Sequence, residues 1–363
     1  MESMDVRGFG GLYAGKRVLV TGHTGFKGSW LTLWLRALGA DVVGLALDPD
    51  TVPAHWSLLA LGDVTDLRID LRDAQAVHAA LQEHRPDIVF HLAAQPLVRR
   101  SYREPVDTFS SNVTGLIHLF EAVRACSSVR VLLNVTTDKV YAEQQSNDVP
   151  YTEGDALGGH DPYSTSKACA ELVSDCYRKS FFAGTDVRLA SARAGNVIGG
   201  GDWAEDRLVP DLVRAARSGQ TLTIRNPHAI RPWQHVLEPL SGYLSLAQQL
   251  WNDAGLAGAW NFGPGPDGEI SVQSLVGRLT RHWDAIGILP DSGTQLHEAA
   301  ALRLDAGKAW QQLAWRPVWD IDTTVTRTAS WYRTFNAFGR VDSADDLTAY
   351  VESARAQGLE WAL

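Results

Sequence analysis

The chain has 363 residues, a hydrophobic fraction of 45% and a formal net charge of −9, enough for one large or two modest domains with a sizeable core. An acidic chain is a poor general binder of nucleic acid or anionic membrane, so we expect neither as a partner. Residues 1–11 have no apolar signal core, and no segment approaches the length of a membrane span. We therefore expect a cytoplasmic protein.

The cysteines and histidines do not indicate a metal centre. Cys126, Cys169 and Cys176 form no CxxC pair, and no cluster of His and Cys has the spacing of a metal site. We expect free thiols in a reducing compartment and no bound metal.

Short apolar runs alternate with amphipathic stretches through the first half of the chain. The runs are typical of strands buried on both faces of a parallel sheet, and they lie at 17–21, 42–47, 87–92, 129–135 and 187–192. The stretches between them predict helices at 29–37, 74–84, 113–125 and 162–182. This alternation predicts an α/β fold with a doubly wound parallel sheet.

After about Gly195 the glycine and proline content rises and aromatic residues cluster. We expect a smaller, mixed α/β region there that binds the substrate. The predicted division is 1–194 and 195–363, with an approximate boundary, because chains of this type often cross between lobes. Most tryptophans of the second part are expected to pack in the core or at an interface.

A glycine-rich turn joins the first predicted strand to the first helix. Its sequence is Gly22-His-Thr-Gly25-Phe-Lys-Gly28. Glycines let the backbone approach a pyrophosphate, and a helix N-terminus offers N–H donors and a positive dipole end. Glycines alone occur in many such turns, but a strand before and a helix after favour a dinucleotide site. The residues of the turn expected at the cofactor are Gly22, Thr24, Gly25, Phe26 and Gly28.

Acidic residues follow the next two predicted strands. Asp48 lies 20 residues after Gly28, where a carboxylate can bind the adenosine ribose hydroxyls, which would favour NAD over NADP. Asp48-Pro49-Asp50 is equally typical of a simple turn, so both interpretations stay open. Asp70 and Leu71 follow the next short strand and are expected near the adenine.

Another predicted strand ends in the sequence His-Leu-Ala-Ala-Gln, residues 91–95. Open α/β sheets bind ligands at the carboxyl ends of their strands. We expect Leu92, Ala93 and Ala94 at the cofactor and Gln95 at the substrate.

Tyr163 and Lys167 have the spacing YxxxK, which places them on one face of a helix. A lysine ammonium beside a phenol lowers the pKa of the tyrosine, which suits a base that removes a hydroxyl proton while hydride leaves the same carbon. The spacing alone is usually explained by a solvated helix face. The glycine turn upstream favours the catalytic interpretation.

The polar residues Thr136, Thr137, Asp138 and Lys139 follow the predicted strand 129–135. Polar side chains at the carboxyl end of a central strand face the ligand crevice. For this segment in isolation, a strand-to-loop turn with Thr and Asp as caps would be the simpler explanation.

The motifs TGxxGFxG, LAAQ, TTDKVY and YxxxK, in this order, resemble the extended short-chain dehydrogenase/reductase superfamily, whose sheet is of the Rossmann type. Within it the chain resembles the nucleotide-sugar 4,6-dehydratases. Most of these carry Thr-Asp-Glu at the strand end, and Lys139 stands where the glutamate would be, as in the CDP-glucose 4,6-dehydratase branch. The segments GHTGFKGSWL, LAAQPLVRRSY, 193–211 and 231–244 resemble the same branch, so the resemblance spans nearly the whole chain.

This resemblance implies a three-step reaction on CDP-glucose in which bound NAD is regenerated. Tyr163 takes the C4 hydroxyl proton as hydride leaves C4, Thr137 hydrogen-bonds the same oxygen, and Lys167 supports Tyr163 and the nicotinamide ribose. Water is then lost across C5–C6, with Asp138 as the acid, before hydride returns to C6 and C5 is reprotonated. Lys139 is either the neutral base at C5 or a charged group that stabilises the enolate and orders a water.

The resemblance also assigns Asn196, Arg207 and Arg231 to the substrate, with both arginines on the pyrophosphate, where a guanidinium can bind two oxygens. Arg225 and His228 are weaker candidates whose default is a solvated surface. A homodimer through the helices 113–125 and 162–182 is implied as well.

Two other functions remain open. One is an epimerase or ketoreductase of the same fold, which needs the tyrosine and lysine but no acid and base at the strand end. The other is a non-enzymatic NAD-binding regulator, which typically loses the tyrosine or the lysine. Asp138 and Lys139 favour dehydration.

Overall fold

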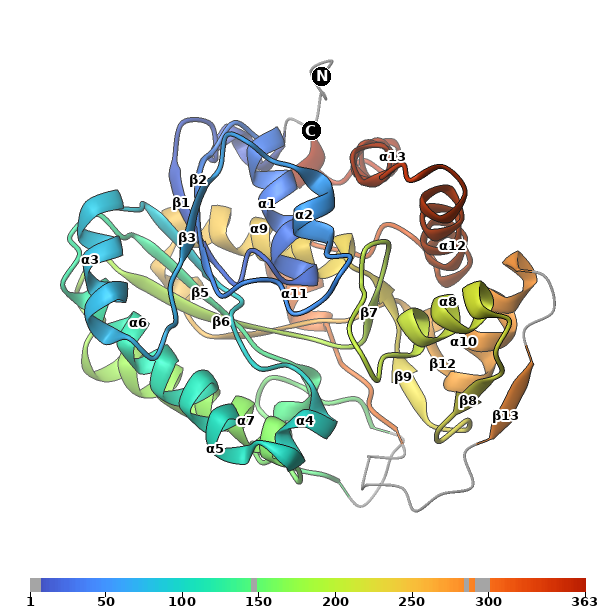
Figure 1. Ribbon diagram of the computed structural model, residues 1–363. Helices are drawn as coiled ribbons and strands as arrows, with labels where there is room; N and C mark the ends of the chain where they lie inside the picture. Colours follow the sequence, from blue (N-terminus) through green and yellow to red (C-terminus); the bar gives the residue numbers. More distant parts are fainter. Residues whose placement is uncertain (1–7, 145–148, 284–286, 291–300) are drawn as a thin grey trace.

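A parallel sheet of seven strands organises the computed structural model, which describes residues 8–144, 149–283, 287–290 and 301–363. Residues 1–7, part of the segment searched above for a signal core, lie outside this range. The strand order is β11-β6-β5-β4-β1-β2-β3, and all six pairings are parallel (Figure 1). The strands are β1 Arg17–Thr21, β2 Asp41–Ala46, β3 Thr65–Arg68, β4 Ile88–His91, β5 Val131–Val135, β6 Arg188–Ala194 and β11 Ala259–Phe262.

This order confirms the predicted doubly wound sheet. The chain runs outward from β1 to β3 and then returns to the other side of β1 with β4, so the order of the strands reverses between β1 and β4. A crevice for ligands forms at such a reversal, outside the carboxyl ends of the strands.

Helices cover both faces of the sheet (Figure 1). Successive residues of a strand point to opposite faces, and in β1 Val18 and Val20 pack in a different core from Leu19. The core of Val18 and Val20 includes α1 (Phe26–Ala37), α9 (Leu237–Asn252) and α13 (Ser343–Ala356). The core of Leu19 includes α3 (Ala74–His84), α6 (Gly115–Arg124) and α7 (Pro162–Ser180).

The predicted helices lie close to the observed ones, and the differences occur at their ends. Helix α1 begins at Phe26 instead of residue 29, because Gly25 is its N-cap and the turn passes directly into the helix. A π-helical segment, Ser110–Thr114, precedes α6. Helix α7 begins where the sequence predicts, with Pro162 in the first turn and the Asp161 carboxylate accepting from Ser164 N at 3.0 Å.

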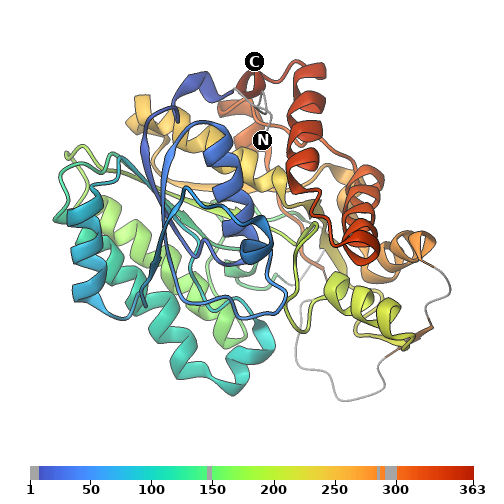
Figure 2. The same cartoon turned by 45° about the horizontal axis from the view of Figure 1, so that its top comes forward.

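A smaller lobe stands beside the carboxyl ends of the central strands. Figure 2 shows its helices grouped on the side of the molecule away from α3 and α6. Its described elements are the strand pairs β7–β10, β9–β12 and β8–β13 with the helices α8, α10 and α12. Their bounds are β7 Val197–Ile198, β8 Leu222–Ile224, β9 Ile230–Pro232, β10 Gln234–His235, β12 Glu269–Ser271, β13 Ile288–Pro290, α8 Leu208–Ser218, α10 Val272–Leu279 and α12 Ile321–Phe338.

The chain beyond residue 195 contributes to both lobes. Strand β11 pairs with β6 at the edge of the sheet, and α9 and α13 pack on its face. The remaining described α-helices are α2 His55–Leu59, α4 Val98–Arg103, α5 Pro105–Phe109 and α11 Gly307–Gln312.

Most tryptophans of the second part are buried, as the sequence predicts; these are Trp203, Trp233, Trp260, Trp315, Trp319, Trp331 and Trp361. The three cysteines are free thiols. Among the described helices, none combines the length and apolar character needed to cross a membrane. In the same part of the chain, no three His, Cys, Asp or Glu side chains are grouped to hold a metal ion.

Phe90→Ala should destabilise the fold strongly, because the Phe90 ring is fully buried in β4. Removing a buried phenylalanine ring typically costs about 3–5 kcal/mol. Phe338→Ala is the matched control, since that ring is 81% exposed and its loss should cost under about 0.5 kcal/mol. Urea denaturation of both variants measures the difference, and similar losses for both would contradict this assignment of the core.

Candidate active site

A cleft of about 1000 Å³ runs along the carboxyl ends of the central strands. Its walls come from the glycine turn, the ends of β2, β4 and β5, the start of α7 and the loop between β7 and α8. The cleft brings together all the residues that the sequence predicts for the site: Gly22, Thr24, Gly25, Phe26, Gly28, Asp48, Asp70, Leu71, Leu92, Ala93, Ala94, Gln95, Thr137, Asp138, Lys139, Tyr163, Lys167, Asn196, Arg207 and Arg231.

The glycine turn has room only for glycine at two of its positions. Gly22 has a φ of +75°, and a Cβ there would lie 2.7 Å from Ala93 N. A Cβ on Gly28 would lie 2.0 Å from Gly22 O, so the third glycine packs directly on the first. The N-cap of helix α1 is Gly25, which has no side chain to cap the helix, and this leaves the first N–H groups of the helix for an anion at the cleft.

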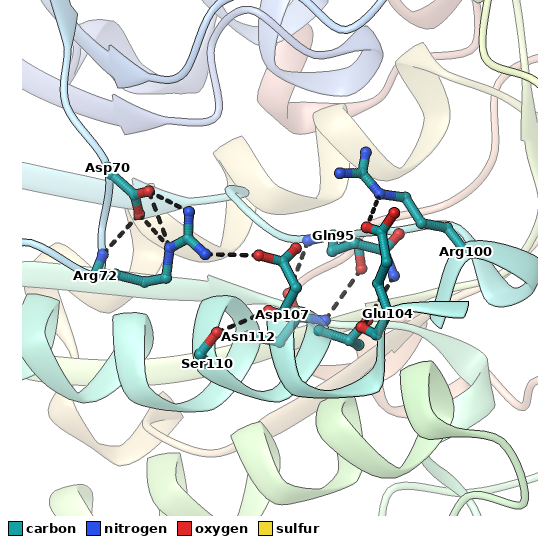
Figure 3. A network of polar contacts seen from close by, with 9 residues as sticks. Asp70, Arg72, Gln95, Arg100, Glu104, Asp107, Ser110 and Asn112 are labelled. Atoms are coloured by element: carbon teal, nitrogen blue, oxygen red, sulfur yellow. Dashed lines mark hydrogen bonds and ion pairs between the residues drawn. The ribbon is translucent and has the colours of Figure 1, made fainter. Parts of the chain in front are cut away.

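Asp48, which follows β2, and Asp70, which follows β3, differ in their contacts with neighbouring arginines. The Asp48 side chain is 90% exposed and lies 3.6 Å from Arg68 Nε, so its carboxylate can accept hydroxyl donors. Asp70 is bound by Arg72, whose Nη2 donates to Asp70 Oδ2 at 2.5 Å, and Arg72 also donates to Asp107 at 2.6 Å (Figure 3). The hydrogen bonds from Arg72 lower the pKa of Asp70.

Gln95 is already engaged inside the protein. Its Nε2 donates to Thr108 Oγ1 at 2.9 Å, and its Oε1 accepts from Leu97 N at 2.6 Å. Asn112 binds both the N–H and the carbonyl of Gln95 (Figure 3). These contacts fix the loop before α4, and Gln95 lines the cleft as well.

Tyr163 and Lys167 lie on one face of α7 and meet the end of β5. The Thr137 hydroxyl lies beside the Tyr163 phenol and donates to Asp138 Oδ1 at 2.9 Å. Lys167 Nζ donates to Val135 O at 3.1 Å. The side chains that the YxxxK and Thr-Thr-Asp-Lys motifs supply are therefore in one place.

The pKa expected for Tyr163 is wrong in direction for this structure. Burial raises the pKa of Tyr163 to about 12, although the Thr137 hydroxyl and the charge of Arg207 oppose the shift. Burial also lowers the pKa of Lys167 to about 8, against the charge of Glu171. The sequence spacing indicates that a phenol and an ammonium are close, but it carries no information on how deeply both are buried.

Asp138 is a buried acid with one unused oxygen. The residue is 2% exposed, and its Oδ2 has no hydrogen-bond partner among the described residues. Lys139 is half-buried and lines the same cleft. An acid and an amine therefore stand beside the tyrosine at the strand end.

Lys27, which was not predicted as a site residue, lines the cleft from the first turn of α1. Its Nζ lies 3.5 Å from Tyr243 OH. Burial, then the charges of Arg207 and Lys167, lower the pKa of Lys27 to about 7, while the charge of Asp138 opposes them. A sequence signal was available, because a cation in the first turn of a helix opposes the helix dipole.

Arginines gather at the other end of the cleft. Arg207 Nη1 lies 3.1 Å from Asp202 Oδ2, and Arg231 is 4% exposed. Asp206, with a φ of +60°, lies between Arg99 at 3.0 Å and Arg225 at 3.5 Å. Arg99 was not predicted, and Arg225 lines the cleft whereas His228 is exposed outside it.

Comparison with known proteins agrees with this geometry. The NAD dependent epimerase/dehydratase family matches residues 18–261. A CDP-glucose 4,6-dehydratase of Salmonella typhimurium is 47% identical over 88% of this chain and 91% of its own length. A UDP-glucose 4-epimerase of Halalkalibacterium halodurans is 26% identical over 87% of this chain and 95% of its own length. The crystal structure of the dTDP-glucose 4,6-dehydratase DesIV from Streptomyces venezuelae, with NAD bound, has a TM-score of 0.76 and 25% identity, covering 89% of this chain and 98% of DesIV.

Proposed function

Since the chain belongs to the NAD-dependent epimerase/dehydratase family, we propose that it dehydrates CDP-glucose to CDP-4-keto-6-deoxyglucose and regenerates its NAD in each cycle. One observation carries the proposal. The acid and amine of Asp138 and Lys139 share a cleft with Tyr163 and Lys167, in a chain 47% identical to a CDP-glucose 4,6-dehydratase. An epimerase or ketoreductase has no need of that additional pair.

The residues at one end of the cleft fit a dinucleotide. The turn at Gly22 and Gly28 leaves no room for a Cβ, the N-terminus of α1 is free of a side-chain cap, and the Asp48 carboxylate is exposed. These groups match the pyrophosphate and the ribose hydroxyls. The chemistry that bound NAD supplies is removal of hydride from C4 of the sugar and its return to C6.

Tyr163 is the base for the C4 hydroxyl. Its phenol meets Thr137, so the two side chains can hold one sugar oxygen between them. Because burial raises the pKa of Tyr163 to about 12, nearby positive charge is needed to form the phenolate. The charge of Arg207 acts on Tyr163 in this direction, and Lys167, four residues along the same helix, lines the same cleft.

Asp138 and Lys139 serve the elimination. The free Oδ2 of Asp138 can protonate the hydroxyl leaving C6, while Oδ1 is held by Thr137. Lys139 acts at C5, where a ketone at C4 acidifies the C–H bond. It does so as a neutral base or as a cation that stabilises the enolate.

The arginine end of the cleft receives the nucleotide. Arg207 and Arg231 bind the pyrophosphate, since a guanidinium can contact two phosphate oxygens at once. Asn196, in the loop after β6, lines the same cleft.

We also propose that the protein is a cytoplasmic homodimer joined through the side formed by α5, α6 and α7. An apolar hollow there is lined by Pro105, Val106, Phe109, Val113 and Cys169, and Leu172 of α7 is 58% exposed. A second copy would cover these side chains. Light scattering of the wild type, and of Leu172→Glu, which should be monomeric, tests the dimer.

The decisive experiment supplies CDP-glucose, UDP-glucose and dTDP-glucose separately to the purified protein. A dehydratase gives a product lighter by one water, with a 4-keto group. An epimerase gives an isomer of unchanged mass, and a regulator gives no turnover. Either of the last two results with CDP-glucose would refute the proposal.

Tyr163→Phe should reduce turnover by roughly 10²–10⁴-fold and leave the affinity for CDP-glucose nearly unchanged, because only the phenolic oxygen is lost. Product is measured as mass loss of one water. Tyr177→Phe, on the same helix and outside the cleft, is the control and should keep full activity. Near-normal product from Tyr163→Phe would remove this residue from the role of base.

Arg231→Ala should weaken the binding of CDP-glucose much more than the binding of NAD. A charge-assisted contact to phosphate is worth about 1.5–3 kcal/mol, which corresponds to roughly a tenfold to hundredfold loss of affinity. Calorimetry with each ligand measures both effects, and Arg217→Ala, on an exposed position of α8, should change neither. Unchanged CDP-glucose affinity in Arg231→Ala would show that the pyrophosphate lies elsewhere.

Lys139→Met should separate oxidation from elimination. Tyr163, Thr137 and Lys167 remain, so bound NADH should accumulate on mixing with CDP-glucose, while turnover falls by about 10²–10⁴-fold and C5 hydrogen exchanges little with solvent deuterium. Lys179→Met, an exposed change on α7, is the control. Loss of NADH formation would instead make Lys139 a positioning residue for oxidation, and a full dehydration rate would place the C5 base elsewhere.

A further inference from the structure

Helix α7 carries a third charged residue on the face that holds Tyr163 and Lys167. Glu171 follows Lys167 by four residues, as Lys167 follows Tyr163, and positions four apart lie on one helix face. Each of the three meets the end of β5. The Tyr163 phenol lies beside Thr137, Lys167 donates to Val135 O at 3.1 Å, and Glu171 Oε1 accepts from Thr136 Oγ1 at 2.5 Å.

Glu171 is 3% exposed, and both of its oxygens are occupied. Its Oε2 accepts from Ser191 Oγ at 2.7 Å and from Arg193 Nη2 at 2.9 Å. Burial by itself raises the pKa of Glu171, but the bond and charge of Arg193, with the hydroxyls of Thr136 and Ser191, lower it overall. The carboxylate is therefore ionised beneath the catalytic residues.

Arg193 connects this carboxylate to other parts of the sheet through hydrogen bonds. Its Nη1 donates to Tyr141 OH at 2.9 Å and to Glu153 O at 3.2 Å. Tyr141 OH in turn donates to Asn261 Oδ1, on β11, at 2.6 Å. Because the contacts of Glu171 itself, and those from Arg193 to Tyr141 and from Tyr141 to Asn261, are buried, Glu171 is held firmly behind the strand end.

We propose that Glu171 is a positioning residue for the reaction: it fixes Thr136, and with it the peptide that carries Thr137 and Asp138, and it supplies the negative charge that faces the Lys167 ammonium. The inference rests on the proposed function, because it presumes that Lys167 and Thr137 serve catalysis. Nothing in it requires Glu171 to touch the substrate.

The titratable groups near Lys167 lie on α7 itself, which carries Tyr163 and Glu171, and on three other segments. Lys27 on α1 is a second cation. His91 on β4 is neutral, since burial, then the charge of Lys167, lowers its pKa to about 3. Asp138, after β5, acts on Lys27 and Tyr163. Glu171 is the carboxylate that raises the pKa of Lys167 against burial.

The sign of the pH effect follows from this arrangement. Lys167 must be charged to assist Tyr163, and its pKa is about 8, so activity should fall as the pH rises through that value. Without the charge of Glu171 the pKa of Lys167 should fall further. The alkaline loss of activity should then begin at a lower pH.

The test measures the protonation of Lys167 directly in Glu171→Gln. Competitive acetylation with acetic anhydride between pH 6 and 10, read by mass spectrometry of the Lys167 peptide, gives the midpoint at which the amine becomes reactive. We expect this midpoint to move down by about one pH unit or more, the usual effect of one nearby opposite charge. The alkaline limb of the kcat/KM profile with CDP-glucose should move in the same direction.

Glu171→Gln leaves the buried Arg193 without its counter-charge, which destabilises a fold strongly. The double variant Glu171→Gln, Arg193→Met removes both charges and keeps the protein folded for the same measurement. The midpoint should stay low in the double variant. A return of the Lys167 midpoint to the wild-type value would overturn the electrostatic part of the proposal.

Thr136→Val tests the positioning part with the ion pair intact. It removes the hydrogen bond to Glu171 and should lower kcat by about tenfold to hundredfold, with the Lys167 midpoint unmoved and KM little changed. Ser174→Ala is the matched control, since it removes another buried bond between α7 and β5, to Asn134 at 2.9 Å, and should keep kcat. Wild-type kcat in Thr136→Val would overturn the positioning role.

These results separate the inference from the proposed function. If the wild type does not dehydrate CDP-glucose, the proposed function fails, and the acetylation midpoint still decides whether Glu171 acts on Lys167. If the wild type does dehydrate it and the midpoint of Glu171→Gln is unmoved, the inference alone fails.

Discussion

The parallel pairing of β1 with β4 is the constraint on which the rest of the site depends. This pairing sets Thr21 opposite His91, so the segments that follow the two strands leave the sheet side by side. Gly22 then lies so close to Ala93 that there is no room for a side chain at Gly22. The pairing of β4 with β5 then brings the polar strand end of Thr136 to Lys139 to the next position along the same edge. The glycine turn and the polar strand end are therefore neighbours, because β1, β4 and β5 are paired in register.

Much of this arrangement could be predicted from the sequence, because it depends on local patterns. Strands β1 and β5 are short apolar runs buried on both faces. The start of α7 is marked by the N-cap residue Asp161 and by Pro162 in the first turn. The residues of the cleft follow from the same patterns, since a parallel sheet gathers the carboxyl ends of its strands at one edge. The predicted site residues consequently line one cavity even though they span more than half of the chain.

What escaped prediction depends on burial and on contacts between distant segments. The pKa of Tyr163 is raised because the phenol is enclosed by residues from several elements. Gln95 is occupied by Thr108 and Asn112, which lie on short helical segments with no clear periodic pattern. Lys27 faces the cleft from a helix whose start the pattern put three residues too late. Each of these features concerns the surroundings of a side chain, which a one-dimensional pattern does not contain.

The return of the chain to its first lobe has a consequence during synthesis on the ribosome. Strand β6 is complete at Ala194, yet its outer edge is paired only when β11, ending at Phe262, has been made. The apolar face of the sheet that includes Val18, Phe90 and Leu133 is likewise covered only after α9 has been made. A nascent chain of this protein therefore exposes an open strand edge and part of a hydrophobic face for the time needed to add nearly seventy further residues, an interval in which binding of a chaperone would protect it from aggregation.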